Sequence, residues 1–388
     1  MHSNRFDFVV IGAGIAGASL AAHLARRGSV LLLEGEEQPG YHTTGRSAAL
    51  FSTIYGNAPV RALSRASRDF LFAPPAGFSD APLVHPRPTL FFARDDQLAL
   101  LDEARADADV ARATRVLDAA EAGRRLPVFR PGYLAAAMID EASADIDVHA
   151  LHQAYLRSAR RHGALLAAGR RAEAFSRGAD GWRVRAGDAE FDARVVVDAA
   201  GAWGDVVARA AGVAPVGLRP LRRTAMVIDA PGGARPDDWP AAIAIDESFY
   251  FRPEAGRLLL SPADETPSEP CDAQPDEWDV AVAVDHFERA VGVPVPRVLR
   301  RWAGLRVFTD DRTPAVGFDP DVPGFFWFAG QGGYGIQMAE GLARAGAALA
   351  CGEALPDALA AEGVRLEDLA PGRAALRRAD PAGPTSNR

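Results

Sequence analysis

The chain has 388 residues, of which 48% are hydrophobic and 24% charged, and its formal net charge is −8 at pH 7. This composition is typical of a globular protein, the length predicts two structural domains, and an acidic balance without a basic block argues against nucleic acid as a partner. The absence of lysine excludes a pyridoxal-phosphate Schiff base and a Walker A loop, and two distant cysteines, Cys271 and Cys351, indicate a reducing compartment rather than a disulfide framework or metal cluster.

The first predicted elements, over residues 6–34, are a strand, a glycine turn, a helix and a second strand. The turn has the spacing G-x-G-x-x-G, formed by Gly12, Gly14 and Gly17, and Glu34 stands at the end of the second strand. Glycines at these places let the backbone approach a pyrophosphate at the helix N-terminus, and the acid binds ribose hydroxyls. The order of elements therefore predicts a dinucleotide site.

A signal peptide or membrane anchor is the alternative for this stretch, because residues 8–25 are almost all apolar or small. Asp7 stands where a signal peptide needs positive charge, and His23 interrupts the far side. No other segment approaches about 20 apolar residues. We therefore expect no transmembrane segment and a cytoplasmic protein, with peripheral association with a membrane left open.

Two later segments repeat the order of strand and glycine turn. An apolar strand over 195–197 precedes Gly201, and another over 325–328 precedes a glycine-rich loop at 330–335. Three such units predict one discontinuous cofactor domain with a second domain inserted into it. Short β-like runs and turns over 216–265 indicate that the second domain is α+β and built on a largely antiparallel sheet.

The predicted fold class is thus α/β. The expected boundaries are 1–80, 140–215 and 300–370 for the Rossmann-like cofactor domain, 81–139 and 216–299 for the substrate-binding domain, and 371–388 for a flexible tail.

Five further stretches are informative together: GYHTTGRSAA at 40–49, ADID at 144–147, DESFY at 246–250, WAGLR at 302–306 and QGGYGIQ at 331–337. In this order they resemble the flavoprotein family that contains D-amino-acid oxidase, glycine and sarcosine oxidases and D-amino-acid dehydrogenases. The D-arginine dehydrogenase type is the most similar branch.

The resemblance implies FAD, bound non-covalently, as the cofactor. Together, the glycine motif and the resemblance assign cofactor binding to Gly12, Gly14, Ala16, Gly17, Glu34, Thr43, Thr44, Gly45, Arg46, Ser47, Ala48, Ala49, Leu50, Ala172, Gly201, Gln331, Gly332, Gly333, Tyr334, Gly335 and Ile336. The loop 331–336 would place amides and a helix N-terminus near the flavin C2 carbonyl, where reduction develops negative charge.

The resemblance also implies the oxidative deamination of a D-amino acid, by hydride transfer from Cα to flavin N5, to a 2-oxo acid and ammonia. The electron acceptor, oxygen or a quinone-like compound, stays open. The expected catalytic set is Tyr55, Arg223, Tyr250, Arg306 and Gly333. A planar guanidinium binds both oxygens of a carboxylate, so the two arginines are the expected substrate anchors.

Tyr55 and Tyr250 are expected to line the substrate pocket, with Tyr55 on a mobile gate at 50–57, and Arg222 is expected to be a solvated neighbour of Arg223. Three positions are assigned to the pocket for the substrate side chain, Leu50, Phe51 and Thr89. The D-arginine branch carries a glutamate in place of Thr89 and a histidine in place of Leu50. Losing both polar groups predicts a preference for neutral or hydrophobic D-amino acids.

Other sites are weaker. His149 and His152 lack a third ligand nearby, so we expect no metal site, and Glu247 is expected to be a surface or structural residue. The alternatives are an oxidase of secondary amines such as sarcosine or of glycine, a non-catalytic flavin-binding subunit that passes electrons, and an NAD-dependent dehydrogenase. The two later glycine turns disfavour the last of these.

Overall fold

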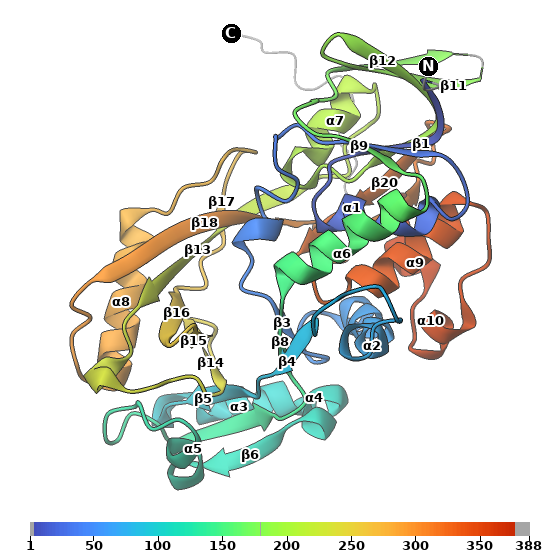
Figure 1. Cartoon of the computed structure of the whole chain (residues 1–388). Helices are drawn as coiled ribbons and strands as arrows, with labels where there is room; N and C mark the ends of the chain where they lie inside the picture. Colours follow the sequence, from blue (N-terminus) through green and yellow to red (C-terminus); the bar gives the residue numbers. More distant parts are fainter. Residues whose placement is uncertain (1–3, 179, 377–388) are drawn as a thin grey trace, which may run out of the picture.

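The computed structural model describes residues 4–178 and 180–376, and two large sheets dominate it (Figure 1). The first sheet has a parallel centre in the order β20-β12-β1-β2-β9, which β10, β11 and β19 extend with antiparallel pairs. Its strands are β1 (Arg5–Ile11), β2 (Val30–Leu33), β9 (Leu165–Ala167), β10 (Ala174–Gly178), β11 (Gly181–Ala186), β12 (Ala189–Asp198), β19 (Ala315–Phe318) and β20 (Phe325–Ala329).

The central strands of this sheet are apolar on both faces, and the longer helices cover one of these faces. Val10 packs into the core beneath the helices, whereas Val9 and Ile11 pack into the core of the opposite face. The helices of this part are α1 (Ile15–Leu24), α2 (Ala58–Phe72), α6 (Val148–Arg161), α7 (Gly204–Ala210), α9 (Ala339–Ala350), α10 (Asp357–Ala361) and α11 (Leu366–Leu369). Figure 1 shows α1, α6 and α9 side by side below the sheet, in agreement with their contacts.

The second sheet is antiparallel except for one parallel pair, β14 with β5. Its order is β21-β18-β13-β16-β15-β14-β5-β7-β6, and β17 pairs with β13. The strands are β5 (Thr89–Ala93), β6 (Arg115–Asp118), β7 (Ala136–Asp140), β13 (Arg219–Ile228), β14 (Ala241–Ala244), β15 (Tyr250–Glu254), β16 (Arg257–Ser261), β17 (Thr266–Pro267), β18 (Val298–Phe308) and β21 (Gln331–Gly332).

Helix α8 (Glu277–Val291) packs on β13 and β16, while α3 (Leu98–Ala106), α4 (Ala108–Ala113) and α5 (Ala119–Arg125) lie at the far end of the sheet (Figure 1). A small antiparallel sheet joins β3 (Leu50–Phe51), β8 (Ala144–Ile146) and β4 (Val84–Pro86). Four short 3-10 helices complete the elements: η1 (Thr44–Arg46), η2 (Asp95–Gln97), η3 (Gly201–Trp203) and η4 (Pro231–Gly233).

The predicted fold class is confirmed, since a Rossmann-like parallel sheet lies beside a largely antiparallel one. The domain boundaries stay a prediction, and the one near residue 300 falls inside β18, which runs unbroken to Phe308. The predicted tail begins too early, because Arg373 donates to Asp311 at 2.7 Å and Leu376 is buried. Residues 377–388 lie outside the described residues.

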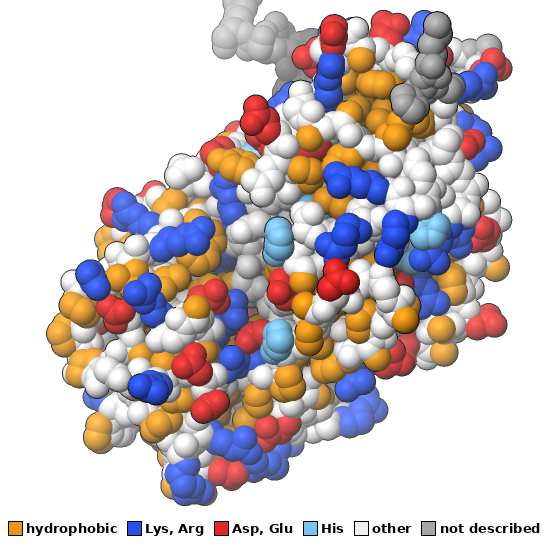
Figure 2. Space-filling view, viewed as in Figure 1, with side chains coloured by type: hydrophobic (Ala, Val, Ile, Leu, Met, Phe, Trp, Pro, Cys, Tyr) orange, Lys and Arg blue, Asp and Glu red, His pale blue; other side chains and the backbone are white. Residues whose placement is uncertain are grey.

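Neither described part of the chain contains a helix long and apolar enough to cross a bilayer. On the face in Figure 2, basic and acidic side chains are interspersed.

Candidate active site

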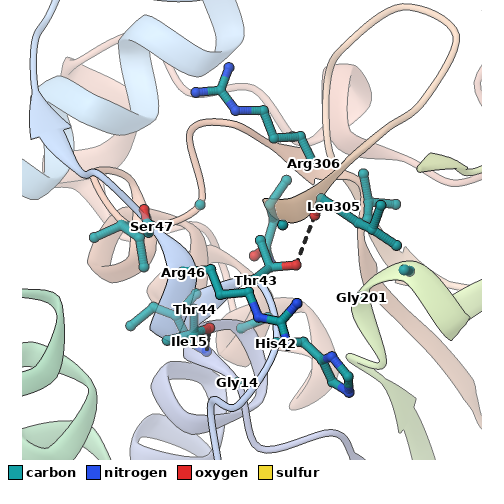
Figure 3. A pocket seen from close by; sticks show the side chains of 18 of the residues that line it. Gly14, Ile15, His42, Thr43, Thr44, Arg46, Ser47, Gly201, Leu305 and Arg306 are labelled. Atoms are coloured by element: carbon teal, nitrogen blue, oxygen red, sulfur yellow. Dashed lines mark hydrogen bonds between the residues drawn. The ribbon is translucent and has the colours of Figure 1, made fainter. Parts of the chain in front are cut away.

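A cavity of about 450 Å³ runs along the carboxyl ends of β1, β2, β12 and β20 and continues to the antiparallel sheet. In open α/β sheets, ligands bind in the crevice beyond these strand ends. The lining residues come from segments that are far apart in the sequence, as Figure 3 shows for Gly14, Thr43, Gly201 and Arg306.

The glycine turn after β1 has no room for side chains. Gly12 has a φ of +96°, and a Cβ added there would lie 2.6 Å from the carbonyl oxygen of Ala199. A Cβ on Gly17 would lie 1.8 Å from the carbonyl oxygen of Gly12. Gly14 and Ala16 line the cavity, whereas Gly17 lies behind the turn and lets α1 approach it. The turn is therefore built for close backbone approach by a ligand.

Glu34 lies at the end of β2 and lines the cavity, as do Ala172 and Gly201. Its Oε2 accepts the Ala13 N–H at 2.9 Å, and its Oε1 accepts the Glu36 N–H at 3.0 Å. These two bonds fix the carboxylate at the edge of the glycine turn, where the motif predicts the ribose hydroxyls.

The segment 43–50 connects the two sheets. Thr44 Oγ1 accepts the Ile15 N–H at 3.0 Å at the start of α1, and Thr43 Oγ1 donates to the Leu305 carbonyl on β18 at 2.8 Å (Figure 3). The predicted residues of this segment that line the cavity are Thr43, Thr44, Arg46, Ser47, Ala48, Ala49 and Leu50.

Two residues of this segment depart from the prediction. Gly45 does not line the cavity but closes a turn by donating to the Gly40 carbonyl at 2.7 Å. Arg46 lines the cavity, yet its guanidinium is turned to the Ala303 and Ala273 carbonyls at 3.0 and 2.9 Å. The guanidinium of Arg46 thus holds the segment 43–50 against these backbone carbonyls.

The loop after β20 contributes Gln331, Gly332, Gly333, Gly335 and Ile336 to the lining. A Cβ on Gly333 would lie 2.8 Å from Arg306 Cζ, so this glycine makes room for the guanidinium. Tyr334, expected to contact the cofactor, is buried behind the loop with its ring 4.9 Å from that of Tyr55. Burial raises the pKa of Tyr334 to about 12.

Two buried nitrogens in the cavity wall lack a protein partner within the described ranges: His42 Nδ1 and Gln331 Nε2. The other nitrogen of His42 lies 3.0 Å from Glu36 Oε1, and the ring packs against Trp203 at 4.7 Å. Buried polar atoms need hydrogen-bond partners, so both nitrogens are free to bond atoms of a ligand that enters the cavity. His42 and Trp203 were not predicted from the sequence, although His42 precedes the predicted Thr43 and Trp203 stands two residues after the predicted Gly201.

The two predicted anchors lie on neighbouring antiparallel strands. Arg306 on β18 pairs with Leu221 on β13, and Arg223 follows two residues later. Since side chains alternate along a strand, both arginines project from one face as a diagonal pair, and both line the cavity. Arg222 projects from the other face, where its Nη2 donates to Asp279 at 2.8 Å, so it is paired rather than solvated.

Each anchor is held on one side. Arg306 Nη1 donates to the Tyr55 hydroxyl at 3.2 Å, and Arg223 Nε donates to the Asp264 carbonyl at 2.7 Å. Tyr250 lies close to both. Burial would raise its pKa, but the charges of the two guanidinium groups, together with hydrogen bonds to Ser261 and Arg223, lower the pKa of Tyr250 overall. The site is thus strongly positive where the two strands meet, which suits a carboxylate.

The pocket beyond these arginines is mostly apolar. Thr89 and Phe91 on β5 and Ile243 on β14 line the cavity from neighbouring strands, and Leu50 on β3 lines it as well. Phe51 does not belong here, because the alternation along β3 turns its ring into the core against Phe72 at 5.4 Å.

Glu247, expected to be a surface or structural residue, lines the cavity while remaining exposed. The Asp246–Ser248 turn, in which Glu247 adopts a φ of +55°, carries it there, and no pattern in the sequence signals this placement.

The model of the FAD dependent oxidoreductase family matches residues 7–349. The uncharacterized oxidoreductase YurR of Bacillus subtilis (strain 168) is 24% identical over 86% of this chain and 91% of its own length. Among solved structures, glycine oxidase from Geobacillus kaustophilus has a TM-score of 0.78 at 21% identity, covering 90% of this chain and 95% of that one. L-alpha-glycerophosphate oxidase from Mycoplasma pneumoniae, solved with FAD bound, has a TM-score of 0.80 at 16% identity, covering 89% and 94%.

The residues of the cavity fit FAD. The turn that excludes side chains at Gly12 and Gly17, the fixed carboxylate of Glu34, and the unpartnered nitrogens of His42 and Gln331 supply donors and acceptors along its length. The glycine turn would hold the pyrophosphate, Glu34 the ribose, and the 331–336 loop the flavin.

Proposed function

The chain belongs to the family of FAD-dependent oxidoreductases, and from this premise we propose that it is a D-amino-acid dehydrogenase or oxidase that deaminates substrates with neutral or hydrophobic side chains. FAD is its cofactor, and when bound it supplies the acceptor for the hydride that the substrate α-carbon loses.

The observation that carries the proposal is the diagonal pair of Arg223 and Arg306 beside the 331–336 loop. A planar guanidinium binds a carboxylate through two parallel hydrogen bonds. Two guanidinium groups together fix both the position and the orientation of the carboxylate. Gly333 supports this role, because any side chain there would displace Arg306.

The tyrosines complete the site. Tyr55 holds Arg306 through its hydroxyl, and Tyr250 lies close enough to both guanidinium groups to feel their charge. Their rings keep water away from the bound carboxylate, which strengthens its attraction to the arginines. The Tyr55 segment stays a proposed gate for substrate entry, to be tested by stopped-flow binding in Tyr55→Phe and Tyr55→Ala.

Phe91 and Ile243 are apolar, and Thr89 between β14 and β7 is uncharged with its hydroxyl 2.9 Å from Ser143 Oγ, so this part of the lining supports neutral or hydrophobic side chains. Glu247 is the opposing feature, because its carboxylate would attract a cationic side chain. The D configuration rests on the resemblance of the sequence stretches to D-amino-acid dehydrogenases.

The test is an anaerobic titration of the purified yellow protein with matched D- and L-amino-acid sets, followed by admission of air. We expect D-methionine, D-leucine or D-phenylalanine to bleach the flavin faster than D-arginine and faster than every L-isomer. Reoxidation by air, or only by an added quinone, then distinguishes oxidase from dehydrogenase. If D-arginine were the best substrate, the proposed specificity would be wrong. If Glu247→Gln then lost its activity toward D-arginine, Glu247 would be the residue that binds the cationic side chain.

Oxidation of sarcosine or glycine is the second candidate, favoured by the similarity to glycine oxidase. The same arginines would bind these carboxylates, so reduction by sarcosine but by no D-amino acid would select it. If no amino acid or amine reduces the flavin, the remaining candidate is a non-catalytic flavin-binding subunit that passes electrons.

A further inference from the structure

A carboxylate outside the cavity wall contacts one of the proposed anchors. Glu265 Oε1 lies 3.4 Å from Arg223 Nη2, and its Oε2 accepts a hydrogen bond from Arg312. The side chains of Arg223, Glu265 and Arg312 are 12%, 33% and 44% exposed, so the row runs from the cavity wall to solvent. We propose that Glu265 is a positioning residue that fixes the fork of Arg223 for the substrate carboxylate, an inference that rests on the proposed function.

The geometry favours positioning because Arg223 is held from one direction only. Its Nε donates to the Asp264 carbonyl at 2.7 Å, and the neighbouring Glu265 takes Nη2. Two adjacent residues thus occupy one edge of the guanidinium, which leaves its orientation toward the cavity fixed. Arg306 is held in the same way, by Tyr55.

The backbone around Glu265 is shaped for this contact. Ala263 lines the cavity with a φ of +53°, and Arg312 has a φ of +59° in the turn between β18 and β19. Residues in this region of φ are strained and cluster at functional sites. Asp264 itself accepts the Thr224 N–H at 2.7 Å, which fastens the loop to β13. One strained position is thus a member of the ion pair, Arg312, and the other lies two residues before its partner Glu265.

Removal of Glu265 has two opposing effects on the affinity for a substrate carboxylate. The negative charge of Glu265 repels a substrate carboxylate, so its removal would tighten binding if charge alone mattered. Because Glu265 is partly exposed, water and salt screen this repulsion. Arginine has many rotamers, and a guanidinium without its tether must be ordered again each time a ligand binds. We therefore expect the disorder of Arg223 in the variant to weaken binding more than the removal of the Glu265 charge strengthens it.

The experiment titrates the FAD-loaded enzyme with benzoate, a carboxylate without an oxidisable α-hydrogen, and follows the flavin absorbance. Glu265→Ala is expected to raise the benzoate Kd by roughly tenfold, because the fork loses one tether. Glu265→Gln keeps an acceptor for Arg223 and is expected to raise it less than about threefold. With a D-amino acid, KM should rise by a similar factor and kcat should change less. An unchanged or tighter benzoate Kd in Glu265→Ala overturns the inference.

A charge swap tests whether Glu265 positions Arg223 or whether its ion pair with Arg312 only joins the two loops. In Glu265→Arg with Arg312→Glu, the outer ion pair is restored, but the new arginine repels Arg223. Weak benzoate binding in this double variant supports positioning, and full recovery overturns it. Wild-type enzyme that holds FAD, binds no benzoate and is not reduced by D-amino acids would instead refute the proposed function.

Discussion

The cofactor end and the substrate end of the cavity are built from different parts of the chain. The cofactor end consists mainly of backbone and small residues, such as Gly12 and Gly14, in turns that follow parallel strands. The substrate end consists of long side chains, such as Arg223 and Arg306, on strands of the antiparallel sheet. A ligand bound by the backbone needs space around that backbone, whereas a ligand bound by side chains needs those side chains held in one orientation. Substitutions at the cofactor end should therefore weaken FAD binding, and substitutions at the substrate end should weaken substrate binding.

The largest effect is expected at the cofactor end. In Gly17→Ala the new Cβ would start 1.8 Å from the Gly12 carbonyl oxygen, so the turn must move. Overpacking of this kind costs about 1–3 kcal/mol of stability. Because the turn that moves is the one that would hold the pyrophosphate, we expect FAD affinity to fall by roughly a hundredfold. FAD fluorescence during equilibrium dialysis measures the affinity. Gly123→Ala, in α5 with nothing within 4 Å of its Cβ, is the matched control and should bind FAD normally.

The next effect is expected at the substrate end. Arg306→Met should lower kcat/KM for a D-amino acid roughly a thousandfold, because two charge-assisted hydrogen bonds are lost. FAD content should stay near that of the wild type, which separates the two ends. Arg222→Met is the control, since Arg222 projects away from the cavity and pairs with Asp279. Equal losses in both variants would contradict the assignment of the anchors.

A pH dependence sharpens the contrast between two tyrosines. Arg223 and Arg306 lower the pKa of Tyr250, whereas burial raises that of Tyr334 to about 12. Tyr250 therefore loses its proton first as the pH rises, and its phenolate then competes with the ligand for the two arginines.

We expect the benzoate Kd of the wild type to rise several-fold as the pH rises toward the ordinary tyrosine pKa of about 10. Benzoate is suited to this measurement because it does not titrate in this range. In Tyr250→Phe the rise should disappear, and in Tyr334→Phe it should remain. An identical rise in Tyr250→Phe would assign the titration to another group.

The smallest effect concerns stability behind the cofactor end. Asp198 ends β12 fully buried, with Oδ1 accepting the Ala200 N–H at 3.1 Å, and burial raises its pKa well above the usual value. Because the unfolded chain ionises at lower pH, this carboxyl lowers stability progressively as the pH rises from about 4 toward its folded pKa.

Asp198→Asn removes that ionisation, so its Tm relative to the wild type should increase by a few degrees between pH 5 and pH 8. Differential scanning fluorimetry checks this, with Asp69→Asn at a 99% exposed side chain as the control. A constant difference in Tm across this range would show that Asp198 does not titrate in the folded protein.

The sequence by itself determined the glycine turn at the cofactor end, because the signals for that turn are local. G-x-G-x-x-G between a strand and a helix, followed by Glu34, describes one continuous stretch whose backbone geometry makes the site. The later turns at Gly201 and 331–336 were found in the same way. The α/β class and the largely antiparallel second sheet followed from short apolar runs and the turn residues between them, which depend only on neighbours along the chain.

Only the tertiary structure decided which side chains meet at the substrate end. Leu50 enters the cavity and Phe51 leaves it because one residue along a strand reverses the face, and register is set by pairing with β8. Glu247 reaches the cavity through a strained turn, and Glu265 meets Arg312 across two loops. These contacts join residues that are distant in sequence, and strand pairing and tertiary packing, not local propensity, bring them together.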